Sequence, residues 1–253
     1  MHILLTNDDG IQAPGLWALY NRFVKNHSIS VIAPDREQSA VGHAITLNQP
    51  LRATRVSVNG NCPGYAVSGT PADCVKLGVL ELLESKPDML ISGINPGANV
   101  GVNVNYSGTV AAAKEAALYG ITAMAVSSMG PAADHYDDAA AFVAKLAVKV
   151  AANGLPFGTF LNVNIPDVPL REVSGIRISE LSVKFFPETI EKRVDPRNRI
   201  YYWQGCDALP VSDNPDIDGT ALSDKCISIT PITCDVTDYS SVEAMKRWGI
   251  ESL

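Results

Sequence analysis

Two adjacent acidic residues, Asp8 and Asp9, follow the first apolar segment of the chain and precede Gly10. Neighbouring residues on a regular strand point to opposite faces of a sheet, so both carboxylates can reach one cation only where the chain turns, as Gly10 permits. Carboxylate oxygens are hard ligands that suit Mg²⁺, Mn²⁺ or Ca²⁺. Asn-Asp-Asp-Gly is also a common turn composition, so these residues alone are compatible with a metal site or a plain β-turn.

Three further polar segments could contribute ligands. Segment 92–101 is rich in asparagine and glycine, which offer neutral oxygen ligands and close backbone approach, and a flexible surface loop is the alternative. Segment 106–111 places hydroxyl and free N–H groups at a helix start, which suits an anion, and a plain Ser/Thr cap is the alternative. In the polar loop 35–48, Ser39 is a candidate metal ligand, unless this is an ordinary exposed loop.

Other catalytic classes lack their signatures in this chain. Segment 106–111 has no lysine, so it is not a Walker A motif, and no G-x-G-x-x-G run follows a predicted strand. No G-x-S-x-G motif is present, which argues against an α/β-hydrolase. The chain contains 4 histidines, all isolated, so a histidine-rich zinc site is not expected.

The elements that must position these side chains alternate between strands and helices. Apolar runs predict strands at 2–6, 29–33, 51–58, 65–68, 89–92, 121–127 and 160–165, and helical spacing predicts helices from Pro14, from Thr70, over 109–119 and over 137–153. Such alternation is typical of a mostly parallel sheet with helices on both faces. Ligands gather at the carboxyl ends of such strands, where loops 7–10, 34–48 and 93–108 are expected to meet.

The pattern changes after residue 174. Segments 176–183, 200–203 and 226–231 resemble β-strands with no helices between them, which predicts an antiparallel extension used for association. We therefore expect a catalytic core over 1–174 and an extension over 175–253 with β-hairpins and a terminal helix.

Composition narrows the partners and the compartment. The chain is 46% apolar and carries a formal net charge of −7, and segment 206–243 holds eight acids and one base. No basic cluster suits polymeric nucleic acid, whereas a small phosphorylated ligand could bind through a metal. No apolar run is long enough to span a membrane, and no secretory signal is evident. The 5 cysteines form no C-x-x-C pair, which favours buried thiols in a reducing, cytoplasmic location.

Taken in order, these motifs resemble the SurE (survival protein E) family of 5′/3′-nucleotidases. The matching segments are 3–10 with 13–15, 33–36 with Ser39, 69–75, 92–95, 106–113, 162–166, 195–197 with 202–203, and 228–231. Each motif is weak alone, but the ordered set covers nearly the whole chain and is highly specific. The resemblance implies a Rossmann-like α/β/α core and a C-terminal extension exchanged between the subunits of a homodimer or homotetramer.

The resemblance also implies the roles of individual residues. Asp8 and Asp9 would be catalytic; one divalent ion per subunit, Mg²⁺ or Mn²⁺ with Ca²⁺ able to occupy the site, would be held by Asp8, Asp9, Ser39 and Asn95. The phosphate of a nucleoside monophosphate would lie among Asn7, Ser107, Gly108 and Thr109. The expected activity is metal-dependent hydrolysis of nucleoside 5′-monophosphates, and of 3′-monophosphates as well.

The sequence leaves two chemical routes open. Asp8 or Asp9 could orient an attacking water, or one of them could attack phosphorus covalently. We favour water, because no second acid is placed for an aspartyl-phosphate relay. A non-catalytic module that senses nucleotides or phosphate is the alternative function, but it would not need the paired acids. A purely structural oligomer would leave the three polar loops unexplained.

Overall fold

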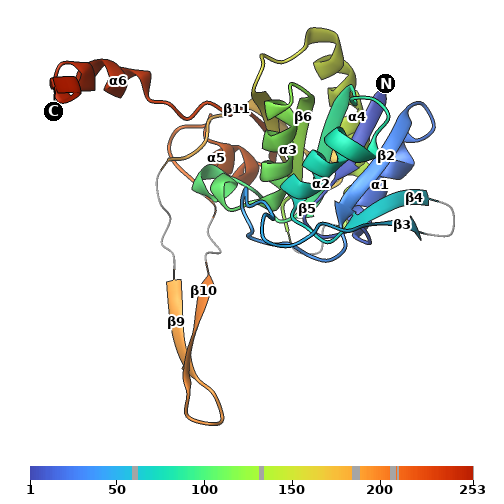
Figure 1. Ribbon diagram of the computed structural model, residues 1–253, viewed down its shortest axis with the longest axis horizontal. Coiled ribbons are helices and arrows are strands. Elements are labelled where there is room, and N and C mark those ends of the chain that lie inside the picture. The colour runs from blue at the N-terminus through green and yellow to red at the C-terminus, as the bar shows by residue number, and fades with distance from the viewer. Residues whose placement is uncertain (59–61, 131–133, 184–188, 206–208, 210, 253) are drawn as a thin grey trace.

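The computed structural model describes residues 1–58, 62–130, 134–183, 189–205, 209 and 211–252. Its main sheet has nine strands in the order β3-β4-β2-β1-β5-β6-β7-β11-β8 (Figure 1). These strands are β1 (His2–Thr6), β2 (Ser28–Pro34), β3 (Ala53–Val58), β4 (Cys62–Val67), β5 (Met89–Pro96), β6 (Thr122–Ser128), β7 (Thr159–Ile165), β8 (Gly175–Ile178) and β11 (Cys226–Thr233). Neighbouring strands from β4 to β7 are parallel, while β3 and β11 pair antiparallel to β4 and β7.

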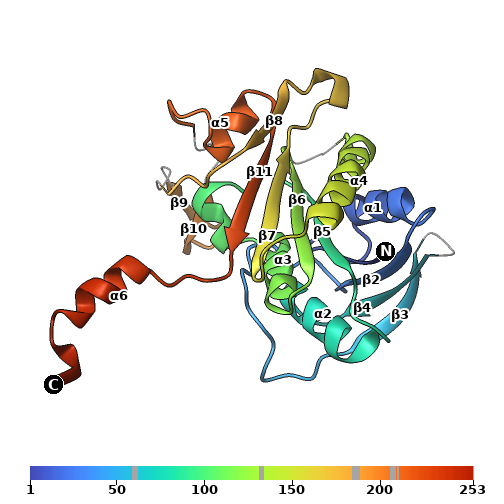
Figure 2. The ribbon, with the colours of Figure 1, turned by 90° about the horizontal axis from the view of Figure 1, so that it is seen from above.

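Helices cover both faces of this sheet, as Figure 2 shows. They are α1 (Pro14–Phe23), α2 (Pro71–Leu77), α3 (Gly108–Leu118), α4 (Tyr136–Asn153) and α5 (Asp218–Ser223), with a π-helical turn over Gly78–Leu82 and 3₁₀ turns over Gly101–Asn105, Leu170–Glu172 and Ile250–Ser252. In β1, Ile3 and Leu5 pack in one apolar cluster with α1 and α4, while Leu4 packs in a second cluster with α2 and α3. A central strand that is buried on both faces has a nearly continuous run of apolar residues, and this run allowed the strand to be predicted from the sequence.

Local signals explain where the helices begin. Pro14 occupies the first turn of α1, and Thr70 and Asp73 form a reciprocal capping box at the start of α2. The hydroxyl of Ser107 accepts a hydrogen bond from the N–H of Val110, which caps α3. The helix starts expected at Pro14, Thr70 and residue 109 are therefore confirmed within one residue.

Two segments project from this body. The antiparallel hairpin of β9 (Thr189–Val194) and β10 (Ile200–Gly205) forms a separate two-stranded sheet, and α6 (Tyr239–Lys246) ends an arm that leaves β11 (Figures 1 and 2). The expected fold class, a mostly parallel α/β/α sheet with a C-terminal antiparallel extension, is confirmed. The use of that extension for association stays a prediction.

Several details differ from the sequence-based expectations. Strand β5 continues to Pro96, so the loop expected from residue 93 begins later, because Asn95 and Pro96 still pair with β6. Strand β9 was not predicted, since its charged residues hide the strand pattern. Helix α5 lies between β10 and β11, where no helix was expected, and β8 ends at Ile178 rather than at residue 183.

The region after residue 174 contributes to more than the extension. Strands β8 and β11 complete the main sheet, with β11 paired antiparallel to β7. The division of the chain at residue 174 stays a prediction. Cys74 and Cys226 are buried free thiols, Cys234 is a partly buried one, and Cys206 and the Cys62 side chain lie outside the description. Within the described part of the chain, no helix has the length and apolarity needed to cross a membrane.

Candidate functional site

The polar loops meet at one edge of the sheet because their parent strands are parallel neighbours. Thr6 of β1 lies opposite Ser92 of β5, so the segments that follow these strands leave from the same edge. The loop after β2 joins them, since the N–H of Gln38 donates to the carbonyl of Asp8 at 2.7 Å. The N–H of Ile11 likewise donates to Pro34 at 2.8 Å. Loops 7–10 and 35–48 are therefore fixed to each other by their backbones.

Asp8 is buried under the first turn of α3. The Thr109 hydroxyl donates a hydrogen bond to its carboxylate, and the residue is 5% exposed. A Cβ added to Gly108 would lie 2.7 Å from Asp8 Cβ and 3.0 Å from Asp8 Oδ2, so only glycine allows this approach. Burial raises the pKa of Asp8, while the Thr109 hydroxyl and the backbone N–H groups of Gly108 and Thr109 oppose that rise.

Asp9 carries an oxygen that the protein does not satisfy. Its Oδ2 atom is buried and has no hydrogen-bond partner within the described residues. Burial raises the pKa of Asp9 to about 7, and the negative charges of Asp8 and Glu37 add to the rise. A buried carboxylate beside two other acids is costly when ionised unless a cation compensates the charge.

Asn7 presents a second free oxygen. Its Nδ2 donates to the carbonyl of Gly10 at 3.0 Å, while its buried Oδ1 has no partner within the described residues. Gly10 makes this turn with φ +96°, and an added Cβ would lie 3.1 Å from the Arg36 backbone. Two residues of this turn, Asn7 and Asp9, thus each carry a buried oxygen without a partner within the described residues.

The other predicted metal ligands lie on adjoining segments. Asn95 is partly buried at the end of β5, and its Nδ2 donates to the carbonyl of Gly97 at 2.6 Å. Ser39 is exposed, and its hydroxyl donates to Glu37 at 2.5 Å. The hydrogen bonds of the described residues do not link Ser39 or Asn95 to either aspartate. The fold thus brings Asp8 against Gly108 and Thr109, with Asn7 and Asp9 on either side of Asp8 in the chain. Ser39 lies in the loop after β2 and Asn95 near the end of β5, and their place at the metal stays a prediction.

The donor set fits a hard dication with a partly aqueous shell. In the described part of the chain, no group of three or more His, Cys, Asp or Glu residues could hold a metal. The predicted set of metal ligands has two carboxylates, and Ser39 and Asn95 would add two neutral oxygens. Mg²⁺ keeps several waters and needs only one or two carboxylates, so two acids with an unpaired buried oxygen suit it.

Two neighbours of Asp9 were missed by the sequence analysis. Glu37 lies in the loop after β2, and its charge raises the pKa of Asp9. Tyr136 begins α4, and burial followed by the charges of Asp9 and Asp167 raises its pKa to about 12. Tyr136 is the first residue of the helix that follows β6, and active sites of parallel sheets form where helices follow the carboxyl ends of strands. That position is the sequence feature from which Tyr136 could have been predicted.

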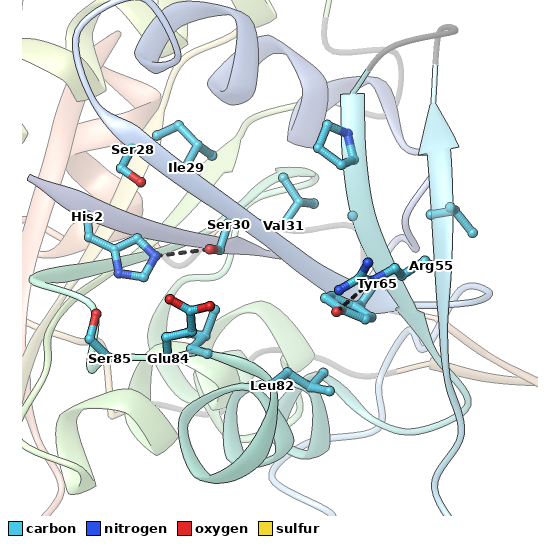
Figure 3. Close-up of a pocket in the computed structure, with 14 residues that line it drawn as sticks. His2, Ser28, Ile29, Ser30, Val31, Arg55, Tyr65, Leu82, Glu84 and Ser85 are labelled. Atoms are coloured by element: carbon cyan, nitrogen blue, oxygen red, sulfur yellow. Dashed lines mark hydrogen bonds between the residues drawn. The ribbon is translucent and has the colours of Figure 1, made fainter.

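Hollows occur at both ends of the sheet. A cavity of about 520 Å³ opens at the amino ends of β1 and β2, where His2 contacts Ser30 and Arg55 contacts Tyr65 (Figure 3). It lies roughly 20 Å along β1 from Asp8 by strand geometry. At the carboxyl edge, a cavity of about 230 Å³ includes Ser107, and a groove of about 490 Å³ includes Tyr136. Ser107 is the one predicted phosphate-binding residue that lines either of these two hollows, and neither is lined by Asp8 or Asp9.

Comparisons with known proteins identify the family of the chain. The model of the family described as survival protein SurE matches residues 3–188. The chain is 55% identical to "5′-nucleotidase SurE" of Desulfatibacillum aliphaticivorans, covering 99% of both chains, and 51% identical to that of Geotalea uraniireducens, covering 99% of this chain and 100% of that one. The crystal structure of the SurE protein from Aquifex aeolicus matches with a TM-score of 0.85 and 35% identity, over 98% of this chain and 99% of that chain. The chain belongs to the SurE family.

Proposed function

We propose that this protein is a metal-dependent phosphomonoesterase that hydrolyses nucleoside 5′-monophosphates, and 3′-monophosphates as well, to nucleoside and phosphate. One observation carries the proposal: the buried, unpaired oxygen of Asp9 lies beside Asp8 at the start of α3. The acid pair demands a cation, and a helix N-terminus favours an anion. Relatives of about 50% identity that bear the name 5′-nucleotidase support the choice of substrate.

Each residue then has a task in the reaction. A divalent cation held by Asp8, Asp9, Ser39 and Asn95 would polarise the phosphoryl group. Asn7, Ser107, Gly108 and Thr109 would surround the phosphate. The Ser107 hydroxyl accepts from the N–H of Val110, so its own proton can stabilise the charge that develops on the phosphate oxygens.

We assign the attacking group to water rather than to a carboxylate. Asp8 or Asp9 orients the water opposite the ribose oxygen that leaves. Asp9 suits this task, because its buried Oδ2 atom has no hydrogen-bond partner within the described residues and can accept a proton from the water. A mutation to asparagine would remove this proton acceptor while retaining its size.

A metal-by-substrate panel tests the proposal. Phosphate release is measured from 5′-AMP, 3′-AMP, 5′-GMP and p-nitrophenyl phosphate, with EDTA, Mg²⁺ or Mn²⁺. We expect turnover of the nucleotides with either metal and none with EDTA. Nucleotide binding without phosphate release under every metal condition would instead support the sensing module and would overturn the enzyme assignment.

We also propose that the projecting segments hold a homodimer or homotetramer together. Every residue of β9 is exposed, including Ile190 and Val194, and so are Tyr202 and Trp203 of β10. Exposed aromatic and aliphatic side chains gathered on one hairpin are typical of a protein interface. Sedimentation should show an oligomer for the full chain and a smaller species after Tyr202→Asp with Trp203→Asp; unchanged mass would contradict this role.

The free thiols of Cys74 and Cys226 support a reducing location, and we propose the cytoplasm. No basic cluster in the sequence suits polymeric nucleic acid, and nucleoside monophosphates are the proposed partners. Fractionation of source cells, with the protein followed by antibody, tests the compartment. Recovery outside the cytoplasmic fraction would refute it.

A further inference from the structure

Two buried asparagines stand out in β7, where apolar residues would be expected. Asn162 and Asn164 are both fully buried, while Leu161 and Val163, which alternate with them, pack into the apolar core. Burying an amide costs free energy unless hydrogen bonds compensate it. The Oδ1 atom of Asn162 has no partner within the described residues, so stability alone does not explain this side chain.

Both asparagines grip one residue of the loop after β5. The N–H of Asn99 donates to Asn164 Oδ1 at 2.8 Å, and its carbonyl accepts from Asn162 Nδ2 at 2.8 Å and Asn164 Nδ2 at 3.0 Å. The side chain of Asn99 donates to the Ser127 hydroxyl at 2.8 Å. Side chains of β7 thus satisfy the Asn99 backbone as a neighbouring strand would, which fixes the loop to the sheet.

The same loop is held on either side of Asn99. The N–H of Gly97 donates to the carbonyl of Ser128 at 2.8 Å, and the N–H of Gly101 donates to Asp218 Oδ2 at 2.7 Å. The carbonyl of Gly97, fixed in this way, accepts the Nδ2 hydrogen bond of Asn95. An amide carries its nitrogen and oxygen on opposite sides, so holding the nitrogen sets where the Asn95 oxygen points.

We infer that Asn162 and Asn164 are positioning residues that fix, through Asn99 and Gly97, the amide oxygen with which Asn95 binds the metal. This inference rests on the proposed function, because it takes Asn95 as a ligand of the divalent cation. Removing a group that hydrogen-bonds to a metal ligand and orients it typically lowers the metal affinity by about 10–100-fold. Strand β7 therefore contributes to the site at a distance, through hydrogen bonds from its side chains to the loop backbone.

Direct Mn²⁺ binding is the test. Asn164→Leu keeps the side-chain size but removes both hydrogen bonds to Asn99. We expect a Kd for Mn²⁺, measured by titration calorimetry and by electron paramagnetic resonance, that is about tenfold or more higher than that of the wild type. At saturating Mn²⁺, KM for 5′-AMP should stay within about threefold, because the substrate contacts remain.

A neighbouring strand supplies matched controls. Thr230 and Ser228 of β11 lie opposite Asn162 and Asn164, and their buried hydroxyls have no partner within the described residues. Thr230→Val and Ser228→Ala therefore also remove buried polar groups, but they break no described hydrogen bond to the loop. Both variants should keep the Mn²⁺ affinity of the wild type, and an equal loss of affinity would show a general packing effect and overturn the inference.

The outcomes separate this inference from the proposed function. If the wild type binds no Mn²⁺, the proposed function fails as well. If the wild type binds Mn²⁺ and folded Asn164→Leu binds it equally well, only the positioning role fails. Unfolding curves in EDTA establish that the variants are folded. Should Asn164→Leu not fold, Asn162→Leu decides, because it removes only one donor to Asn99 and we expect a smaller rise in Kd.

Discussion

The carboxyl edge of the sheet and the projecting segments differ in which of their groups have no partner within the described chain. At the edge, Asn7, Asp8 and Thr109 are buried and packed, and the oxygen atoms that lack a partner within the described residues include those of Asn7 and Asp9. In the hairpin of β9 and β10, six residue pairs form the ladder, while aromatic side chains such as Tyr202 and Trp203 are exposed. The carboxyl edge thus has buried oxygens that a small cation could satisfy, whereas the hairpin exposes an apolar surface that only a larger partner could cover.

The difference shows that an unpaired buried oxygen and an exposed apolar surface indicate different kinds of partner. A buried acceptor without a donor can be satisfied by an ion or a water, and beside a pair of acids it points to a cation. An exposed apolar surface has no such limit and points to another protein chain. Substitutions that affect the two regions unequally test this distinction.

The largest effect is expected from Asp9→Asn. The change removes the charge but keeps the size, so metal-supported phosphate release should fall by about 10³-fold or more. The metal-free protein should be at least as stable as the wild type, because burial and the charges of Asp8 and Glu37 disfavour the ionised carboxylate. Phosphate release with excess Mn²⁺ and thermal unfolding in EDTA measure the two effects.

The projecting arm supplies the control for this substitution. Asp238 caps the exposed helix α6, and asparagine caps a helix as well as aspartate does. Asp238→Asn should leave phosphate release within about twofold. Wild-type turnover by Asp9→Asn, or a loss shared by Asp238→Asn, would remove the contrast between the regions.

Gly108→Ala should have the next largest effect. The added Cβ would lie 2.7 Å from Asp8 Cβ, so α3 must move away from the acid. We expect about 1–3 kcal/mol less stability, as for an overpacked core, and activity lower by roughly 10–100-fold. Urea unfolding and phosphate release measure these changes.

Gly175 of β8 offers a comparison for this glycine. A Cβ there would meet only Cys226 Sγ at 3.9 Å, which is ordinary contact. Gly175→Ala should therefore change neither stability nor activity by much. If Gly108→Ala behaved in the same way, the tight approach of α3 to Asp8 would not matter for the site.

The sequence predicted the carboxyl edge better than the extension, for a physical reason. Runs such as 2–6 are apolar because both faces of the sheet are covered, and Thr70 with Asp73 caps its helix through local bonds. These signals lie within a few residues of one another. Strand β9 has the composition TIEKRV, in which charged side chains mask the strand pattern, because the hairpin does not pack on the core.

Contacts between distant residues explain what the sequence could not give within the site. Asp8 and Asp9 were identified as a pair by type and spacing. Glu37 approaches Asp9 only because the loop after β2 bonds to Asp8, and Asn164 reaches Asn99 across 65 positions. Such pairings depend on sheet order, so spacing along the chain does not predict them.

A pH dependence of moderate size should distinguish the regions further. The pKa of Asp9 is about 7 in the fold and about 3.9 in an unfolded chain. Its contribution to stability is thus fully present below pH 4 and is lost as pH rises towards 7, so unfolding in EDTA should become easier over that range. Asp9→Asn should flatten this dependence, whereas Asp238→Asn should not.

Metal binding should show the opposite slope. The cation binds ionised Asp9, so Mn²⁺ affinity should rise with pH below about 7, by at most about tenfold per pH unit for one released proton. Calorimetry in buffers of different ionisation enthalpy counts the protons. Affinity that does not change between pH 5 and pH 7 would contradict the placement of Asp9 at the cation.

The smallest effect is expected from Thr70→Ala at the start of α2. The Thr70 hydroxyl accepts from the N–H of Asp73 at 3.1 Å and donates to the carbonyl of Ala44 at 2.8 Å, so it serves a helix and the loop 35–48 together. We expect about 1 kcal/mol less stability and a change in activity of no more than a few-fold. Thr70→Ser keeps the hydroxyl and should retain both bonds. A large loss of Mn²⁺ affinity in Thr70→Ala alone would show that the loop carrying Ser39 depends on this cap, and the site would then extend beyond the carboxyl edge to the second helix.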